Sequence, residues 1–196
     1  MLAFQFAAAW TALVLFLCFV PALVGFPTAG ADLVRLSAQL ALLAYGLAAT
    51  LLLLARPADW RPLSERLRLA RCAWTMGWLT YLLHVGLAFH FLHDWSHAAA
   101  VEHTAAVGGF GAGIWFNHLF TLVWTADVLA WQLRPAWYAE RPARIEWLVH
   151  GYMTFIILNA AVVFAAEPMR WLGVALYVWL GLLLYRRKRL EKCPPK

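Results

Sequence analysis

The sequence predicts an all-α, polytopic membrane protein with six transmembrane helices and both termini in the cytoplasm. Composition is the first observation behind this prediction. Of the 196 residues, 64% are hydrophobic and only 13% are charged, and the mean hydropathy is +0.67. A soluble domain is about half apolar and about a quarter charged. The composition therefore excludes an ordinary soluble domain, a disordered chain and a nucleic-acid-binding protein.

Six long apolar segments are the second observation. Each approaches or exceeds the length of helix that crosses a bilayer, about 20 residues. They are uniformly apolar rather than alternating, which indicates helices and not the strands of a barrel. Because they leave almost no soluble mass, we expect a single transmembrane helical bundle over residues 1–196. The segments are Leu2–Leu23, Leu33–Leu54, Cys72–Leu92, Gly111–Leu133, Ile145–Ala166 and Met169–Tyr185.

The basic residues are the third observation, because they collect on one side of the predicted membrane. Of the 16 lysines and arginines, 14 lie in the C-terminal tail and in the loops after the second and fourth segments. Only Arg35 and Arg170 lie on the other side. Basic loops stay in the cytoplasm, so both termini are expected there. We expect a multi-pass protein of the cell inner membrane, with anionic lipids at its basic loops and other membrane proteins as partners.

Histidines are the polar residues that stand out in this apolar chain. All seven lie between positions 84 and 150. Ionisable groups inside a membrane are costly, and each is a candidate for function. On one continuous helix, several of them would form a stripe about 100° wide that climbs to the periplasmic end of the third segment. Imidazole and carboxylate groups suit Cu, Zn or Fe. The expected metal ligands are His90, His93, Asp94, His97, Glu102 and His103.

A haem is the alternative cofactor. His90 and His118 lie at similar predicted depths on adjacent segments, where they could be the two axial ligands of a b-type haem. Two other interpretations stay open. The histidines could be solvated at a helix end, or they could titrate near neutral pH in a proton-conducting or pH-sensing role.

A second polar pair lies near the cytoplasmic side. Asp127 and His150 have matched depths near the inner ends of the fourth and fifth segments. Pairing would spare either group from being buried alone. This indicates a structural clasp between two helices, with a site of proton uptake as the alternative. His84, near the middle of the third segment, is expected to be neutral and bonded to a hydroxyl group on a neighbouring helix.

These features favour an integral membrane protein with a periplasmic histidine cluster that binds a transition metal or haem, in a redox or metal-handling role. A non-catalytic subunit or assembly factor of a larger complex is the first alternative. The second is a proton or small-solute pathway. Such a pathway would connect Asp127, His150, His84 and His90.

Overall fold

The computed structural model describes residues 1–24, 29–60 and 62–192, and the regular elements in these ranges are helices. The all-α prediction is therefore confirmed. The six long helices are α1 (Leu2–Val24), α2 (Ala29–Leu53), α3 (Glu65–Leu92), α5 (Ile114–Leu133), α7 (Ala143–Leu158) and α8 (Met169–Lys192). The shorter elements are α4 (His97–Gly108), α6 (Pro135–Glu140), the 3₁₀ turns η1 (Pro57–Asp59) and η2 (Gly111–Gly113), and η3 (Asn159–Val163), a π-helical continuation of α7.

Each predicted apolar segment coincides with one long helix, but two helices extend into basic sequence. Helix α3 begins at Glu65, not at Cys72, because Ser64 caps it by accepting a hydrogen bond from the Leu67 N–H at 3.3 Å. Helix α8 continues past Tyr185 through the basic run that follows. The long aliphatic stems of lysine and arginine tolerate such positions at the ends of apolar helices.

Three helices in the described ranges are long and apolar enough to cross a membrane. They comprise Gly30–Leu53, Glu65–Leu92 and Ala143–Val163. Helix α4 and the segment Gly111–Leu133 give a fourth candidate if this pair, which is bent by 109°, counts as one span. A shorter apolar helix covers Leu2–Leu17. Length and composition thus support several membrane-spanning helices.

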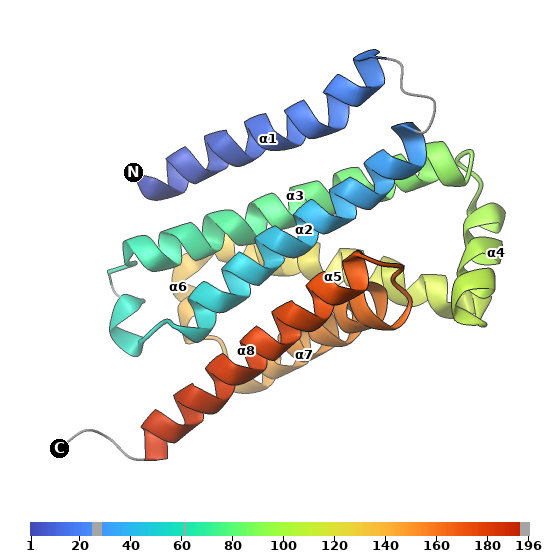
Figure 1. Cartoon of the computed structure of the whole chain (residues 1–196). Helices are drawn as coiled ribbons and strands as arrows, with labels where there is room; N and C mark the ends of the chain where they lie inside the picture. Colours follow the sequence, from blue (N-terminus) through green and yellow to red (C-terminus); the bar gives the residue numbers. More distant parts are fainter. Residues whose placement is uncertain (25–28, 61, 193–196) are drawn as a thin grey trace.

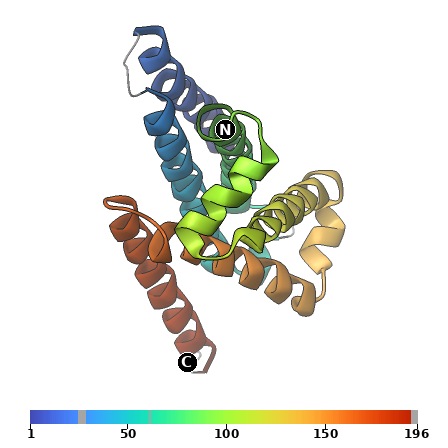
Figure 2. The same cartoon turned by 90° about the vertical axis from the view of Figure 1, so that its right-hand side faces the viewer.

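The long helices run side by side, and the two ends of the bundle differ (Figure 1). The start of α1, the end of α8 and helix α6 lie at one end, which we call the basic end. Helix α4 lies at the opposite end, which we call the histidine end, and Figure 2 shows it running across the helices there. Contacts between α2 and α3, α1 and α3, α3 and α5, α5 and α7, and α2 and α8 hold the bundle together.

Aromatic rings fill the centre of the bundle. Trp74 of α3 and Trp124 of α5 are almost fully buried, with ring centroids 5.4 Å apart, and Tyr45 of α2 lies 5.8 Å from Trp74. Closer to the basic end, Tyr138 of α6 stacks on Trp131 with centroids 4.6 Å apart. Large rings in tilted and stacked contacts contribute both buried area and fixed geometry. The core therefore joins α2, α3, α5 and α6.

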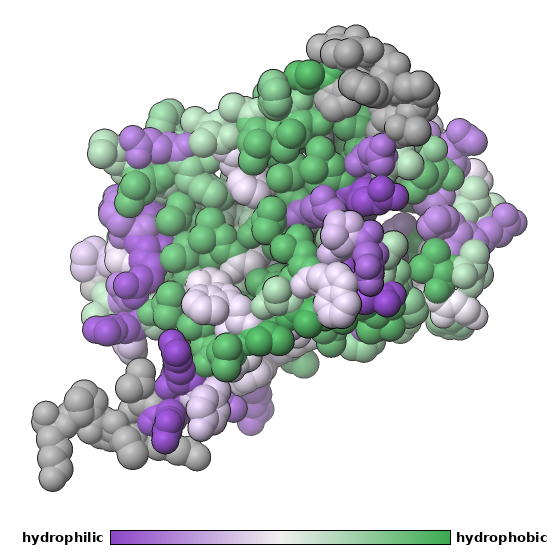
Figure 3. Space-filling view, viewed as in Figure 1, coloured by the Kyte–Doolittle hydropathy of each residue, from purple (hydrophilic) through white to green (hydrophobic). Residues whose placement is uncertain are grey.

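The outer surface is strongly apolar. Phe4 is 80% exposed and Leu148 is 73% exposed, far more than a soluble protein would tolerate over so many large residues. In the face seen in Figure 3, hydrophobic residues cover much of the middle, and hydrophilic residues gather toward both ends. A bundle with this surface is suited to a lipid environment.

Candidate functional site

A sharp turn at the histidine end separates α3 from α4. Helix α3 stops at Leu92, and α4 starts at His97. Between them, Asp94 and Trp95 have φ angles of 46° and 58°. Left-handed backbone is uncommon for residues other than glycine and cannot continue a right-handed helix.

Ser96 completes this turn. Its Oγ accepts a hydrogen bond from the Ala99 N–H at 3.2 Å and so caps α4. The prediction of one continuous helical stripe is therefore wrong, since α3 ends at Leu92, five residues before His97. The residues assigned to that stripe were His90, His93, Asp94 and His97.

The turn brings the start of α4 against α5 and pairs His97 with His118. Their Nε2 atoms are 3.3 Å apart, and their rings stack with centroids 5.5 Å apart at 24°. Trp115 contacts both rings, at 5.8 Å from His97 and 5.5 Å from His118. The sequence had placed His118 opposite His90. The structure puts it beside His97 instead, because α4 folds back across the bundle.

His93 and His103 form a second contact, with ring centroids 5.2 Å apart at 67°. His93 is 9% exposed, and its Nδ1 has no hydrogen-bond partner among the described residues. Burial lowers the pKa of His93, and the nearby His103 lowers it further. The His93 ring is therefore neutral at pH 7.

The remaining predicted ligands point elsewhere. His90 is exposed and packs on Phe91 and Trp95, with centroids 4.5 Å and 6.3 Å away. Asp94 and Glu102 are also exposed. Across the described ranges, no group of three or more His, Cys, Asp or Glu residues is placed to hold a metal ion. The metal site therefore stays a prediction. The structure brings the histidines together as two pairs, His97 with His118 and His93 with His103, and not as one cluster.

A cavity of about 470 Å³ lies behind these histidines, between α2, α3, α4, α5 and η3. Its walls are mostly apolar, and it extends from Trp124 near the middle of the bundle to the histidine end. Four of the seven histidines line it: His84, His93, His103 and His118. Matching residues by depth alone did not predict this cavity, because depth fixes only one of three coordinates.

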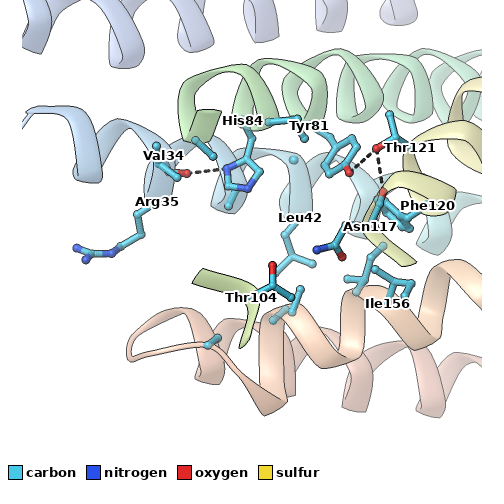
Figure 4. A pocket seen from close by; sticks show the side chains of 18 of the residues that line it. Val34, Arg35, Leu42, Tyr81, His84, Thr104, Asn117, Phe120, Thr121 and Ile156 are labelled. Carbon is cyan, nitrogen blue, oxygen red and sulfur yellow. Dashed lines mark hydrogen bonds between the residues drawn. The ribbon is translucent and has the colours of Figure 1, made fainter. Parts of the chain in front are cut away.

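His84 illustrates how polar groups are accommodated there (Figure 4). Its Nδ1 lies 2.9 Å from the Val34 carbonyl oxygen and 3.4 Å from the Ser37 Oγ. Since a carbonyl oxygen can only accept, Nδ1 carries the proton. The expected bond to a neighbouring helix is present, but its main partner is a backbone carbonyl and not a hydroxyl group.

The basic end contains a compact polar cluster around Asp127. This carboxylate forms a buried ion pair with Arg141 and accepts hydrogen bonds from the Trp74 Nε1 at 2.9 Å and the Tyr138 hydroxyl at 3.0 Å. The side chains of Asp127 and Arg141 are only 2% and 3% exposed. Burial and the nearby Asp127 raise the pKa of Tyr138, so its hydroxyl group remains a donor.

Arg141 is the residue that sequence reasoning missed. It joins the two predicted partners, since its guanidinium binds Asp127 and lies 3.1 Å from the His150 Nε2. It also lies 4.0 Å above the Tyr138 ring. The sequence does contain a signal for this contact. A lone carboxylate in a membrane span needs a cation, and the loop that follows Asp127 is rich in arginine. The fully bonded cluster favours the structural clasp, and the proton pathway stays a prediction.

Comparison with known proteins adds no further assignment. No protein-family model, no curated protein and no solved structure matches this chain. The fold and surface define the class as a helical protein with several candidate membrane spans.

Proposed function

We propose that this chain is a six-span inner-membrane protein that binds a transition metal ion at its histidine end, in a metal-handling role. The observation that carries the proposal is the 3.3 Å separation between the Nε2 atoms of His97 and His118. Two nitrogens bound to one tetrahedral ion through bonds of about 2.05 Å lie about 3.3 Å apart. Little rearrangement is needed beyond moving the proton between the two Nε2 atoms to the Nδ1 of the ring that donates it.

The number of protein ligands supports a role in handling a metal rather than storing it permanently. Structural zinc sites use four protein ligands, whereas sites that exchange ligands keep open positions. Two imidazoles leave such positions for water, a substrate or a ligand from a partner protein. Trp115 contacts both rings and would restrict their rotation.

A metal ion fits this pair better than a haem does. A haem held by two histidines would need space for its ring system between their imidazoles. The His97 and His118 rings overlap at 24°, which leaves no space for that ring system. His90, the other expected axial ligand, packs on Phe91 and Trp95.

The membrane placement belongs to the same proposal. All six long helices would cross the bilayer, with the basic end in the cytoplasm and the histidine end in the periplasm. Arginines of the loops and of α8 would then contact anionic lipid headgroups. The exposed apolar side chains along the helices support this arrangement.

Cobalt titration tests the metal site. We expect the protein in nanodiscs to bind one Co²⁺ per chain and to develop the visible absorption of a tetrahedral complex. His97→Ala and His118→Ala should each abolish this spectrum. His90→Ala is the matched control and should leave it unchanged. Absence of the spectrum in the unmodified protein, or its loss only in His90→Ala, would refute the proposal.

A further inference from the structure

The cavity between α2, α3, α4, α5 and η3 contains polar groups that have no role in the proposed metal site. Its volume, about 470 Å³, lies within the range of small-molecule sites, about 300–1,000 Å³. Its walls are mostly apolar, with a few polar groups directed inward. Figure 4 shows His84 and Tyr81 of α3 on one side and Asn117 and Thr121 of α5 on another.

Three hydroxyl protons on this lining are already bonded within the protein. The Thr121 Oγ1 donates to the Asn117 carbonyl at 3.0 Å, so in its 2.8 Å contact with Tyr81 it must accept. The Tyr81 hydroxyl proton therefore points at Thr121, and the Tyr81 oxygen can only accept from a further group. The Thr104 hydroxyl likewise donates to the Ala100 carbonyl at 2.8 Å.

His84 adds the strongest acceptor. Its Nδ1–H is bound to the Val34 carbonyl, which leaves the neutral ring with an acceptor lone pair on Nε2. The His84 and Tyr81 rings lie side by side on α3, with centroids 6.4 Å apart. Together they form a pair of acceptors beside an apolar space.

Two donors on the same lining are not available to a ligand. Arg35 pairs with Asp32 at 3.2 Å, and Figure 4 shows its guanidinium directed out of the cavity. The Nε1 of Trp124 is buried in the wall. The Asn117 amide and the imidazoles of His93, His103 and His118 can each donate and accept, so they can also bond to a hydroxyl group.

We propose that this cavity binds a membrane-soluble alcohol or phenol, whose hydroxyl group donates a hydrogen bond to one member of the acceptor pair, the His84 Nε2 or the Tyr81 oxygen. The apolar walls accommodate the hydrocarbon body. A hydroxyl group thus pairs one acceptor, whereas a ligand without a donor pairs neither, which is costly in an apolar space. The inference is independent of the metal site.

A matched pair of probes tests this inference: 4-nonylphenol, which can donate, and 4-nonylanisole, its methyl ether, which cannot. Binding is measured by native mass spectrometry and equilibrium binding to the protein in nanodiscs, with empty nanodiscs as the correction for partitioning. We expect the phenol to bind about tenfold more tightly, the effect of one hydrogen bond to a buried acceptor. Equal binding, tighter binding of the ether, or no binding of either probe would overturn the proposal.

Two threonine variants identify the acceptors. Thr121→Val frees the Tyr81 hydroxyl proton, so the ether gains a donor and the phenol-to-ether preference should fall several-fold. Thr125→Val is the matched control, because Thr125 lies one turn further along α5 and its Oγ1 accepts from the Trp78 Nε1 at 2.9 Å. The preference should stay unchanged there. An unchanged preference in Thr121→Val would overturn the proposed acceptor pair.

A cavity-filling variant tests the location. Ala88 lines the cavity, and Ala88→Leu should weaken binding of both probes at least tenfold. Gly181→Leu is the control, since a Cβ atom added at Gly181 meets nothing within 4 Å and Gly181 does not line the cavity. Retained binding in Ala88→Leu would contradict this location. If Ala88→Leu fails to fold, the comparison of Thr121→Val with Thr125→Val still decides the outcome.

Discussion

The two ends of the bundle treat their polar residues in opposite ways. At the basic end, Asp127 is fully enclosed, and its ion pair with Arg141 is supplemented by Trp74 and Tyr138. At the histidine end, the rings of His97 and His118 lie in contact but are partly open, and a cavity opens behind them. Polar groups whose hydrogen bonds are all made within the protein fix its structure. Groups that still have a free lone pair or N–H can bind a metal ion or a small molecule.

The connections between helices explain this difference. At the basic end, α6 follows α5 directly and folds under it, which brings Tyr138 and Arg141 back to Asp127. At the histidine end, α4 crosses the bundle and lines one side of the cavity between α2, α3 and α5. Each end therefore has a short helix between two long ones. At the basic end this helix completes a closed hydrogen-bond network, and at the histidine end it lines a cavity.

The largest effect should come from breaking the ion pair. Asp127→Ala leaves Arg141 as a buried, unpaired cation and removes an acceptor from Trp74 and Tyr138. The expected loss is about 3–5 kcal/mol of unfolding free energy. Asp32→Ala is the control, because Asp32 and Arg35 form an exposed pair whose loss costs about 0–1 kcal/mol. Chemical denaturation in a detergent micelle measures the unfolding free energy of both variants. Equal losses would show that the enclosed ion pair stabilises the protein no more than the exposed one.

A smaller effect is expected where α8 meets η3 near the histidine end. A Cβ atom added at Gly173 would lie 2.5 Å from the Ala161 carbonyl oxygen, so Gly173→Ala must push the two backbones apart. Overpacking of this kind costs about 1–3 kcal/mol. Gly181→Ala, on the same helix with open space around it, should be nearly neutral in the same denaturation assay. If the two variants are equally stable, this close packing is not required.

The two serine caps offer a matched comparison of the ends. Ser96 caps α4 beside His97, and Ser64 caps α3 at the opposite end. Replacing either with Ala should cost about 1 kcal/mol. Only Ser96→Ala should also weaken Co²⁺ binding, because α4 carries a proposed ligand and α3 carries none. Weaker Co²⁺ binding in Ser64→Ala would show that metal affinity follows overall stability and not the local site.

His93 at the histidine end should give a pH dependence that is smaller still. Burial lowers the pKa of His93 in the folded protein, with His103 contributing, so the unfolded chain binds a proton more readily. Stability is therefore full above the unfolded histidine pKa of about 6.5 and declines as the pH falls below it. Thermal unfolding between pH 5 and 8 should show this decline, and His93→Gln should flatten it. An unchanged slope in His93→Gln would assign the effect to another group.

The helices were predictable from the sequence, because long apolar runs have few other structures available to them in a membrane. The clasp was half predicted: matched depth brought Asp127 and His150 together, but Arg141 lies in a loop, where hydropathy gives no direction. The sequence indicated that histidines gather near the end of the third segment, but not which of them lie in contact. The stripe through His93 and His97 failed because Asp94 and Trp95 adopt left-handed backbone, for which neither residue carries a strong sequence signal.

X-ray absorption at the zinc edge is the most direct test of a ligand pair at the histidine end. After loading with one Zn²⁺ per chain, we expect two imidazole nitrogens at about 2.0–2.1 Å, with oxygen atoms completing the shell. His118→Ala should reduce the count to one imidazole. A shell with three or more imidazoles, or an unaltered spectrum in His118→Ala, would contradict the pairing of His97 with His118.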